Sequence, residues 1–447
     1  MKLNIEKYKY KIDNIYIILF FLGIVGMYVG LVNMYFWLVL LFIRLIISKK
    51  TEVGIFCLLL GSSIFGRLFE SPLLTIVIAT VVPIIGFVIL RREIIKVFIF
   101  RHVSYFFLSL VILFFVIYFF LSDQNPYAQG KIIRLVVRAY IWLTAFLILF
   151  EYKKINVKEF TFFFLILSLF YLSQAYQVYN IRPSSFFDIA FFRDIIHVIG
   201  RNEAGTLAVN PHTLGYLSCG AIAFYISSKK TIYKNNTQFI LLSLLSFFII
   251  LVSGARQTML IYIAIYTIAF MLKKGRIEIK SIIAGLVIFI VLVFSMQFFA
   301  DKSEHIGRMF SEENTTGEKL HRDIDTPFKV MEINPTFGIG FGEYPNYANK
   351  EYPHNFFLEI LCEEGILGLA ILSTIILIYI LPIANKTNLF FYTTNSGIAP
   401  IIFLIVFFAR GMISGDVSSS ISFIVIIFCY RIRHYRFIPK KKVISGN

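Results

Sequence analysis

The chain has 447 residues, of which 58% are hydrophobic and only 15% are charged, and its mean hydropathy is +0.78. About a quarter of the residues in a soluble domain are charged, so this composition excludes a soluble protein and indicates a polytopic membrane protein. The formal net charge of +17 needs a separate explanation, because strongly basic chains also include nucleic-acid binders.

Apolar stretches of about 15 to 25 residues, the length of transmembrane helices, alternate with short polar loops along the chain. The pattern predicts about fourteen spans and an all-α fold. The spans are residues 15–32, 34–48, 53–69, 72–90, 97–121, 132–150, 160–177, 212–228, 239–254, 257–272, 281–299, 357–382, 397–411 and 418–430. We therefore expect residues 1–447 to form a single integral membrane domain.

Basic residues follow alternate spans on the side of the Lys-rich N-terminus. They are Lys49-Lys50, Arg91-Arg92, Lys153-Lys154, Lys229-Lys230, Lys273-Lys274 and the terminal run Arg431 to Lys442. Because Lys and Arg concentrate in cytoplasmic loops, this pattern predicts that both termini are cytoplasmic. The net charge then reflects mostly topology, and nucleic acid is not an expected partner.

The four cysteines lie in or beside apolar runs at unrelated spacings, which indicates neither a disulfide framework nor a zinc site. No small-residue cleavage site follows the apolar run after Lys11, so we expect the first span to be retained.

Two longer loops fall on the predicted outer side, at residues 178–211 and 300–356. In the first loop, Arg193 and His197 have the i,i+4 spacing that places two side chains on one helix face. The second contains a hydrophilic run at 303–325, and loops of this length are usually functional or disordered. The working end of the protein is therefore predicted outside.

The predicted outer side uses arginine where the cytoplasmic side uses mostly lysine. The outer arginines are Arg67, Arg134, Arg138, Arg182, Arg193, Arg201, Arg256, Arg308, Arg322 and Arg410. The planar guanidinium matches phosphate oxygens well, although ion pairs and snorkelling to lipid headgroups are alternatives for any one arginine. Arg134 and Arg138, at i,i+4 in one span, should face the protein interior or a cavity.

Arg256 stands between two apolar spans, in the turn from Ser253 to Thr258. An arginine there is costly near lipid, so it is a candidate functional residue, with a headgroup-level turn as the alternative.

A pair of aspartates, Asp323 and Asp325, has the spacing by which many glycosyltransferases hold a metal on a nucleotide sugar. The pair falls in the predicted outer loop, where nucleotide sugars are absent, so neither a metal nor another cofactor is expected.

The most informative stretch runs from Gly338 to Leu369, GIGFGEYPNYANKEYPHNFFLEILCEEGILGL. Gly338, Gly340 and Gly342 would let the backbone approach a bulky ligand, or would simply form a tight loop. Asn355 or His354 can cap a helix whose apolar positions continue into the bilayer.

The order of these features, G-x-G-x-G, a polar insert, His-Asn, an aromatic-rich helix and E-x-G-I-L-G, resembles the O-antigen ligase and O-antigen polymerase (Wzy) superfamily. The turn containing Arg256 is similar to the S-x-S-R turn of that family, with Ala255 in place of the second Ser.

The resemblance implies glycosyl transfer from undecaprenyl-diphosphate-linked oligosaccharide at the outer face of a bacterial cytoplasmic (inner) membrane. His354 would be the catalytic base, with Glu203, Glu351 or Glu359 as alternatives, and Arg256 would act in catalysis and diphosphate binding. The remaining diphosphate candidates are Arg201, Arg193, Arg322, Arg134 and Arg138. The substrate-binding candidates are Gly338, Gly340, Gly342, Tyr344, Tyr352 and Asn355.

We expect a polymerase that joins lipid-linked repeat units into O-antigen or capsular polysaccharide, because fourteen spans with one large late outer loop resemble polymerases. The alternatives are an O-antigen ligase that transfers polymer to lipid A core and, from another class, a lipid-linked oligosaccharide flippase. Donor and acceptor would both be lipid-linked oligosaccharides. The lipid bilayer, a chain-length regulator and a flippase are the other candidate partners.

Overall fold

A computed structural model describes fourteen stretches and single positions of the chain. They are residues 2–48, 88, 91–151, 157–178, 211–228, 237–253, 256–271, 325–348, 351–353, 355–381, 404, 406–408, 411–412 and 416–430. The regular elements in these residues are helices, without a strand, as the all-α prediction requires.

The first half of the described chain forms long helices. They are α1 (Lys2–Tyr28), α2 (Met34–Ser48), α5 (Arg91–Phe100), α6 (His102–Leu121), α7 (Pro126–Glu151) and α8 (Val157–Val178). The middle contributes α10 (Pro211–Ser228), α11 (Thr237–Ser253) and α12 (Arg256–Met271).

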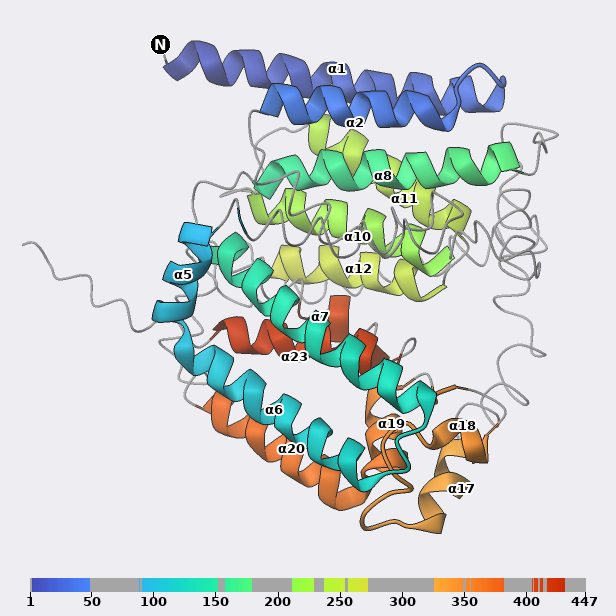
Figure 1. Cartoon of the computed structure of the whole chain (residues 1–447). Helices are drawn as coiled ribbons and strands as arrows, with labels where there is room; N and C mark the ends of the chain where they lie inside the picture. The colour runs from blue at the N-terminus through green and yellow to red at the C-terminus, as the bar shows by residue number, and fades with distance from the viewer. Residues whose placement is uncertain are drawn as a thin grey trace, which may run out of the picture.

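These helices lie in two adjoining groups. In one group α1 and α2 form a hairpin beside α8, and α10 packs against α8, α11 and α12 (Figure 1). In the other group α7 packs against α6 and against α23 (Val417–Tyr430), while α20 (Gly365–Ile380) packs along α6. One large cluster of buried aromatic and aliphatic side chains runs through both groups.

Three short helices gather where α6 and α7 meet, at the lower right of Figure 1. They are α17 (Thr326–Ile333), α18 (Tyr344–Tyr347) and α19 (Phe356–Glu363). We call residues 325–348 and 355–363 the α17–α19 module. The module contains the described part of the loop predicted at 300–356, apart from residues 351–353.

Several predicted spans coincide with helices within a few residues, among them 34–48, 160–177, 212–228, 257–272 and 418–430. The spans 53–69 and 281–299 lie outside the described residues, as does 72–90 apart from residue 88. Of 397–411 only a few positions are described. The total of fourteen therefore stays a prediction.

Two predicted spans are wrong as single helices. The span 97–121 is divided at Arg101 into α5 and α6, and the span 357–382 is divided at Glu364 and Gly365 into α19 and α20. Both divisions fall at polar residues that interrupt the apolar runs, Arg101-His102 at the first and Glu363-Glu364 at the second.

Among the described helices, α6 is long and apolar enough to cross a membrane by itself. Shorter apolar segments occur in α1, α2, α8, α10, α11, α20 and α23. Large apolar side chains point outward from several helices, including Leu22, Phe42, Phe106 and Phe120. Such extended apolar surface is unfavourable in water and suits contact with lipid.

Candidate active site

The glycine turn, Gly338–Gly342, lies against the C-terminal end of α19. The amide of Ile339 donates to the Cys362 carbonyl and the amide of Gly340 donates to the Glu363 carbonyl, each at 2.9 Å. Gly338 has φ +77°, and a Cβ there would lie 2.3 Å from the Glu363 carbonyl oxygen. Position 338 therefore requires glycine, because a side chain there would prevent the close approach of the turn to α19.

The break between α19 and α20 is stabilised by the residues just before the glycine turn. Gly365 has φ +71°, and a Cβ there would lie 2.4 Å from the Thr336 carbonyl oxygen. The first amides of α20 are satisfied by the preceding loop, since Ile366 donates to Pro335 and Leu367 donates to Thr336. The bend is thus a hydrogen-bonded joint rather than a frayed helix end.

Asn355 caps α19, as predicted. Its Oδ1 accepts hydrogen bonds from the amides of Phe357 and Leu358, at 2.9 and 3.1 Å, and its backbone is extended. The side-chain amide donates to the Met412 carbonyl at 3.1 Å. Asn355 therefore fixes where α19 begins and ties that end to the segment that precedes α23.

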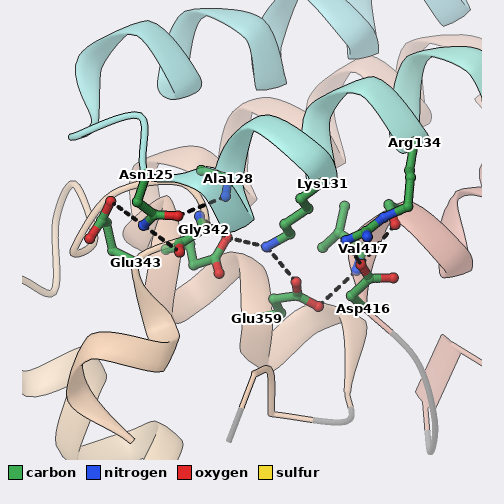
Figure 2. Close-up of polar contacts among 11 residues, drawn as sticks. Asn125, Ala128, Lys131, Arg134, Gly342, Glu343, Glu359, Asp416 and Val417 are labelled. Atoms are coloured by element: carbon green, nitrogen blue, oxygen red, sulfur yellow. Dashed lines mark hydrogen bonds and ion pairs between the residues drawn. The ribbon is translucent and has the colours of Figure 1, made fainter. Parts of the chain in front are cut away.

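A buried ion cluster joins α7 to the module (Figure 2). Lys131 of α7 is 0% exposed, and its Nζ lies 2.6 Å from Glu359 Oε1 and 2.5 Å from Glu363 Oε2. The two glutamates are one turn apart on α19, so a single ammonium reaches both. Lys131, Glu359 and Glu363 are called the Lys131 cluster below.

Each carboxylate of the Lys131 cluster also holds a backbone amide. Glu363 Oε2 accepts from the amide of Gly342, and Glu359 Oε2 accepts from the amide of Val417, both at 2.8 Å. The cluster therefore connects α7, the glycine turn, α19 and the first residue of α23 (Figure 2). Burial without these contacts would be strongly unfavourable for every charge in the cluster.

Carboxyl groups outnumber cations in this region. Glu364 is fully buried next to the Lys131 cluster, and within the described residues neither of its carboxyl oxygens has a hydrogen-bond partner. With one cation and three carboxyl groups, the net charge beside α19 is accordingly negative unless two of the carboxyl groups carry a proton.

The start of α7 is tied to the glycine turn by a second polar contact. Asn125 accepts from the amide of Ala128 at 2.8 Å and donates to the Gly342 carbonyl and to Glu343 Oε1, at 3.1 and 2.9 Å (Figure 2). The other oxygen of Glu343 accepts from the side-chain amide of Asn346 in α18.

The arginine pair predicted in the sixth span lies farther along α7. Arg134 is 46% exposed, and its guanidinium is 3.7 Å from Asp416 Oδ2 beside the start of α23. Asp416 also accepts from the hydroxyl of Ser418 at 2.7 Å. Arg138 is half-buried on the same helix and has interactions of its own. Arg134 keeps an accessible edge that a phosphate could reach.

Most of the predicted substrate-binding residues contact other parts of the chain. Gly338 and Gly342 are approached by Glu363 and Ala128, and Gly340 lies near Ser122 and Glu343. Tyr344 is 1% exposed and packs with Val330 and Cys362. Tyr352 is half-buried and Asn355 is the helix cap. Contact of these residues with a sugar stays a prediction.

Several predicted site residues lie outside the described residues, namely His354, Arg193, Arg201 and Arg322. Arg256 is the first residue of α12, and its backbone position is described. Asp323 is also outside, and among the described residues no group of His, Cys, Asp or Glu could hold a metal ion.

Five buried polar residues near the glycine turn and α23 were not predicted from the sequence: Lys131, Glu363, Glu364, Glu343 and Asp416. A signal was present on α7, because Lys131, Arg134 and Arg138 have spacings of three and four and share one helix face. The i,i+4 pair of Glu359 and Glu363 inside a predicted span was a second signal.

An apolar pocket of about 570 Å³ lies beside the module. It is lined by Phe357 of α19, by residues of α20 and α23, and by Leu404 and Phe408. The lining is almost wholly hydrocarbon and aromatic.

Comparison with known proteins gives one family match. Residues 241–373 match the family described as O-antigen ligase, and the matched segment contains α12, the α17–α19 module and the first part of α20. No curated protein matches the chain. The match supports the O-antigen polymerase and ligase superfamily for this chain and confirms the resemblance seen in its motifs.

Proposed function

We infer that this protein, a chain of the O-antigen polymerase and ligase superfamily, is a glycosyltransferase. It polymerises lipid-linked oligosaccharide repeat units outside the cytoplasmic membrane. The carrying observation is that the matched residues 241–373 include both Arg256 and the whole stretch from the glycine turn through the Asn355-capped α19. The match supports polymerase and ligase activities alike, and the choice of polymerase rests on the predicted number of spans and the large late loop.

The proposed reaction transfers the growing glycan from its undecaprenyl diphosphate carrier to a second lipid-linked repeat unit. A hydroxyl oxygen of the acceptor sugar attacks the anomeric carbon of the donor, and the bond from that carbon to the diphosphate oxygen breaks. The hydroxyl proton passes to His354, and the electron pair leaves with the diphosphate. No oxidant, reductant or metal is needed for this balance.

The departing diphosphate needs positive charge where negative charge develops. Arg256 is the first candidate, with Arg193, Arg201 and Arg322 as further ones. Arg134 supports this assignment, because its guanidinium is partly exposed and only loosely paired with Asp416. Arg138 lies one turn farther along the same helix.

The apolar pocket beside α19 is consistent with a polyprenyl substrate. Its lining offers hydrocarbon contacts and almost no polar groups, and Phe357 of the pocket is two residues from the cap Asn355. A polyprenyl tail bound there would bring its diphosphate toward the N-terminal end of α19.

The surface glycan of a strain that lacks the protein tests the proposal. Loss of a polymerase is expected to leave lipid A core that carries a single repeat unit. Expression of the chain from a plasmid should restore the ladder of longer glycans. An unchanged ladder in the deletion strain contradicts the proposal.

An O-antigen ligase is the second candidate, because the family that matches residues 241–373 is described as O-antigen ligase. A ligase would transfer finished polymer to lipid A core. Its loss would leave bare core while polymer accumulates on the lipid carrier, so the same deletion strain separates the two candidates.

A further inference from the structure

We propose that Lys131 is a positioning residue for the transfer reaction, which holds α19 and the glycine turn in the arrangement that the reaction requires. The inference rests on the proposed function for its activity readout. It assigns to Lys131 no contact with substrate.

The contacts of Lys131 converge on the elements that carry the candidate chemistry. Its ammonium pairs with Glu359 and Glu363, and these carboxylates hold the amides of Val417 and Gly342. Glu359 is one helical turn from Asn355, the cap that immediately follows His354 in the chain. A shift of α19 relative to α7 would therefore move the chain at Asn355.

Phe341, Phe356 and Ile360 anchor the α17–α19 module in the main core, but the buried apolar cluster that belongs to the module alone is small. Apart from the main core, its buried apolar cluster consists of Val330, Tyr344 and Cys362, with Ile339 and Ala348 packed against it. The glycine turn is irregular backbone and Val417 is the first residue of α23, so the amides of Gly342 and Val417 have no acceptor within a helix. The Lys131 cluster supplies these acceptors from a fixed point on α7.

A role in stability alone explains the Lys131 cluster poorly. Replacement of a buried ion pair by apolar groups of similar volume is often neutral or stabilising, so a buried ion cluster is weak evidence for stability. A cluster that links four segments defines their relative position, and a small displacement of catalytic groups is costly in rate.

A matched control lies far from the module. Arg44 of α2 is buried between Asp13 of α1 and Glu159 of α8, with hydrogen bonds of 2.8 Å to each carboxylate. We call these three residues the Arg44 cluster. It has the same composition as the Lys131 cluster, one cation and two carboxylates. Its residues lie on α1, α2 and α8, which carry none of the candidate site residues.

The test compares neutral versions of the two clusters in purified protein reconstituted in lipid vesicles. Lys131→Met, Glu359→Gln and Glu363→Gln are combined in one variant, and Arg44→Met, Asp13→Asn and Glu159→Gln in the other. Each combination removes the three charges of its cluster together, so that no member of the cluster is left buried as a charge without its counter-charge. The glutamine oxygens can still accept from Gly342 and Val417.

We expect kcat for polymer formation to fall about tenfold to a hundredfold in the Lys131 variant, with KM within about twofold of wild type. The Arg44 variant should keep the wild-type kcat. The single variant Lys131→Arg, which keeps the cation, should keep most of the wild-type kcat. Wild-type kcat in the neutral Lys131 variant overturns the proposal.

Amide hydrogen exchange gives a readout that does not depend on activity. Peptides that contain Gly342 and Val417 should exchange faster in the Lys131 variant, and should be unchanged in the Arg44 variant. Unchanged exchange at both positions in the Lys131 variant overturns the positioning role. If wild-type protein forms no polymer, the proposed function fails while this exchange measurement still decides the role of Lys131.

Discussion

The Lys131 cluster and the Arg44 cluster solve the same electrostatic problem in two different surroundings. Both place one buried cation between two buried carboxylates from elements distant in sequence. Both also cover the cation with aromatic rings, at 4.1 Å from the Phe162 ring centroid for Arg44 and at 4.6 Å from that of Phe341 for Lys131.

The difference lies in what the carboxylates hold. Asp13 and Glu159 come from long helices whose apolar faces already pack in the main core. Glu359 and Glu363 come from an eight-residue helix, and they accept amides from backbone that is not helical or that only begins a helix. The Arg44 cluster therefore joins helices alone, whereas the Lys131 cluster also holds the glycine turn and the start of α23.

This contrast indicates where functional residues are expected in a mostly apolar chain. Packed apolar helices need no polar contact to keep their places, so a buried ion cluster among them is compatible with a purely architectural role. Irregular backbone inside a mostly apolar protein needs dedicated partners, and candidate functional residues concentrate where these partners occur.

The largest expected effect on the rate of polymer formation concerns His354. It also separates the α17–α19 module most clearly from the rest of the protein. Removal of a positioned general base costs about 10²–10⁴-fold in rate, so His354→Ala should nearly abolish polymer formation in correctly inserted protein. His102→Ala is the control, because His102 is exposed at the start of α6, away from the module. Glycan ladders and initial rates measure both variants.

A second comparison asks whether the amide of glutamine can replace the imidazole. His354→Gln keeps hydrogen bonding but cannot accept the proton. A long ladder in His354→Gln at wild-type expression excludes base catalysis by this residue. It directs attention to Glu203 or Glu351, because the buried carboxylate of Glu359 is held by Lys131 and by the amide of Val417.

The joint between α19 and α20 should respond strongly to an added methyl group. Gly365→Ala places a side chain on left-handed backbone, which costs about 1–3 kcal/mol, and also meets the Thr336 carbonyl oxygen. Gly130→Ala in α7 meets nothing nearer than Arg134 at 3.8 Å and should stabilise the helix by roughly 0.5–1 kcal/mol. Thermal unfolding in detergent measures both, and equal Tm values for both variants would contradict the described joint.

A smaller loss is expected at the proposed diphosphate site. Arg256→Lys keeps the charge but loses the planar fork, and charged hydrogen bonds contribute about 1.5–3 kcal/mol, so the rate should fall roughly tenfold or more. Arg92→Lys at the exposed start of α5 is the control and should keep the wild-type rate. Full activity in Arg256→Ala at normal protein levels would remove Arg256 from the site.

The smallest effect on stability compares two asparagine caps. Asn355→Ala removes the acceptor for the first amides of α19, and Asn33→Ala removes the acceptor for Tyr35 at the start of α2. Each should cost about 1 kcal/mol of stability. Only Asn355→Ala is expected to lower the transfer rate, and an equal loss of rate in both variants would contradict the functional difference between the two regions.

Structural features that depend on local interactions could be predicted from the sequence, whereas those that depend on contacts between distant residues could not. Hydropathy located helices such as α2 and α8, and the Asn-Phe step located the cap of α19, because both signals are local. The pairing of Lys131 with Glu363 spans 232 positions of the chain and had no local signal. The bend at Gly365 also could not be predicted, because its acceptors come from the loop at Pro335 and Thr336.

Reconstitution of the purified protein tests whether this chain by itself joins lipid-linked repeat units. The protein is placed in lipid vesicles and supplied only with undecaprenyl-diphosphate-linked single repeats, and the products are separated by size. A polymerase should form a ladder of lipid-linked glycans, with one undecaprenyl diphosphate released for each bond formed. Single repeats that stay unchanged until lipid A core is added, and are then transferred to it, would exclude a polymerase and identify a ligase.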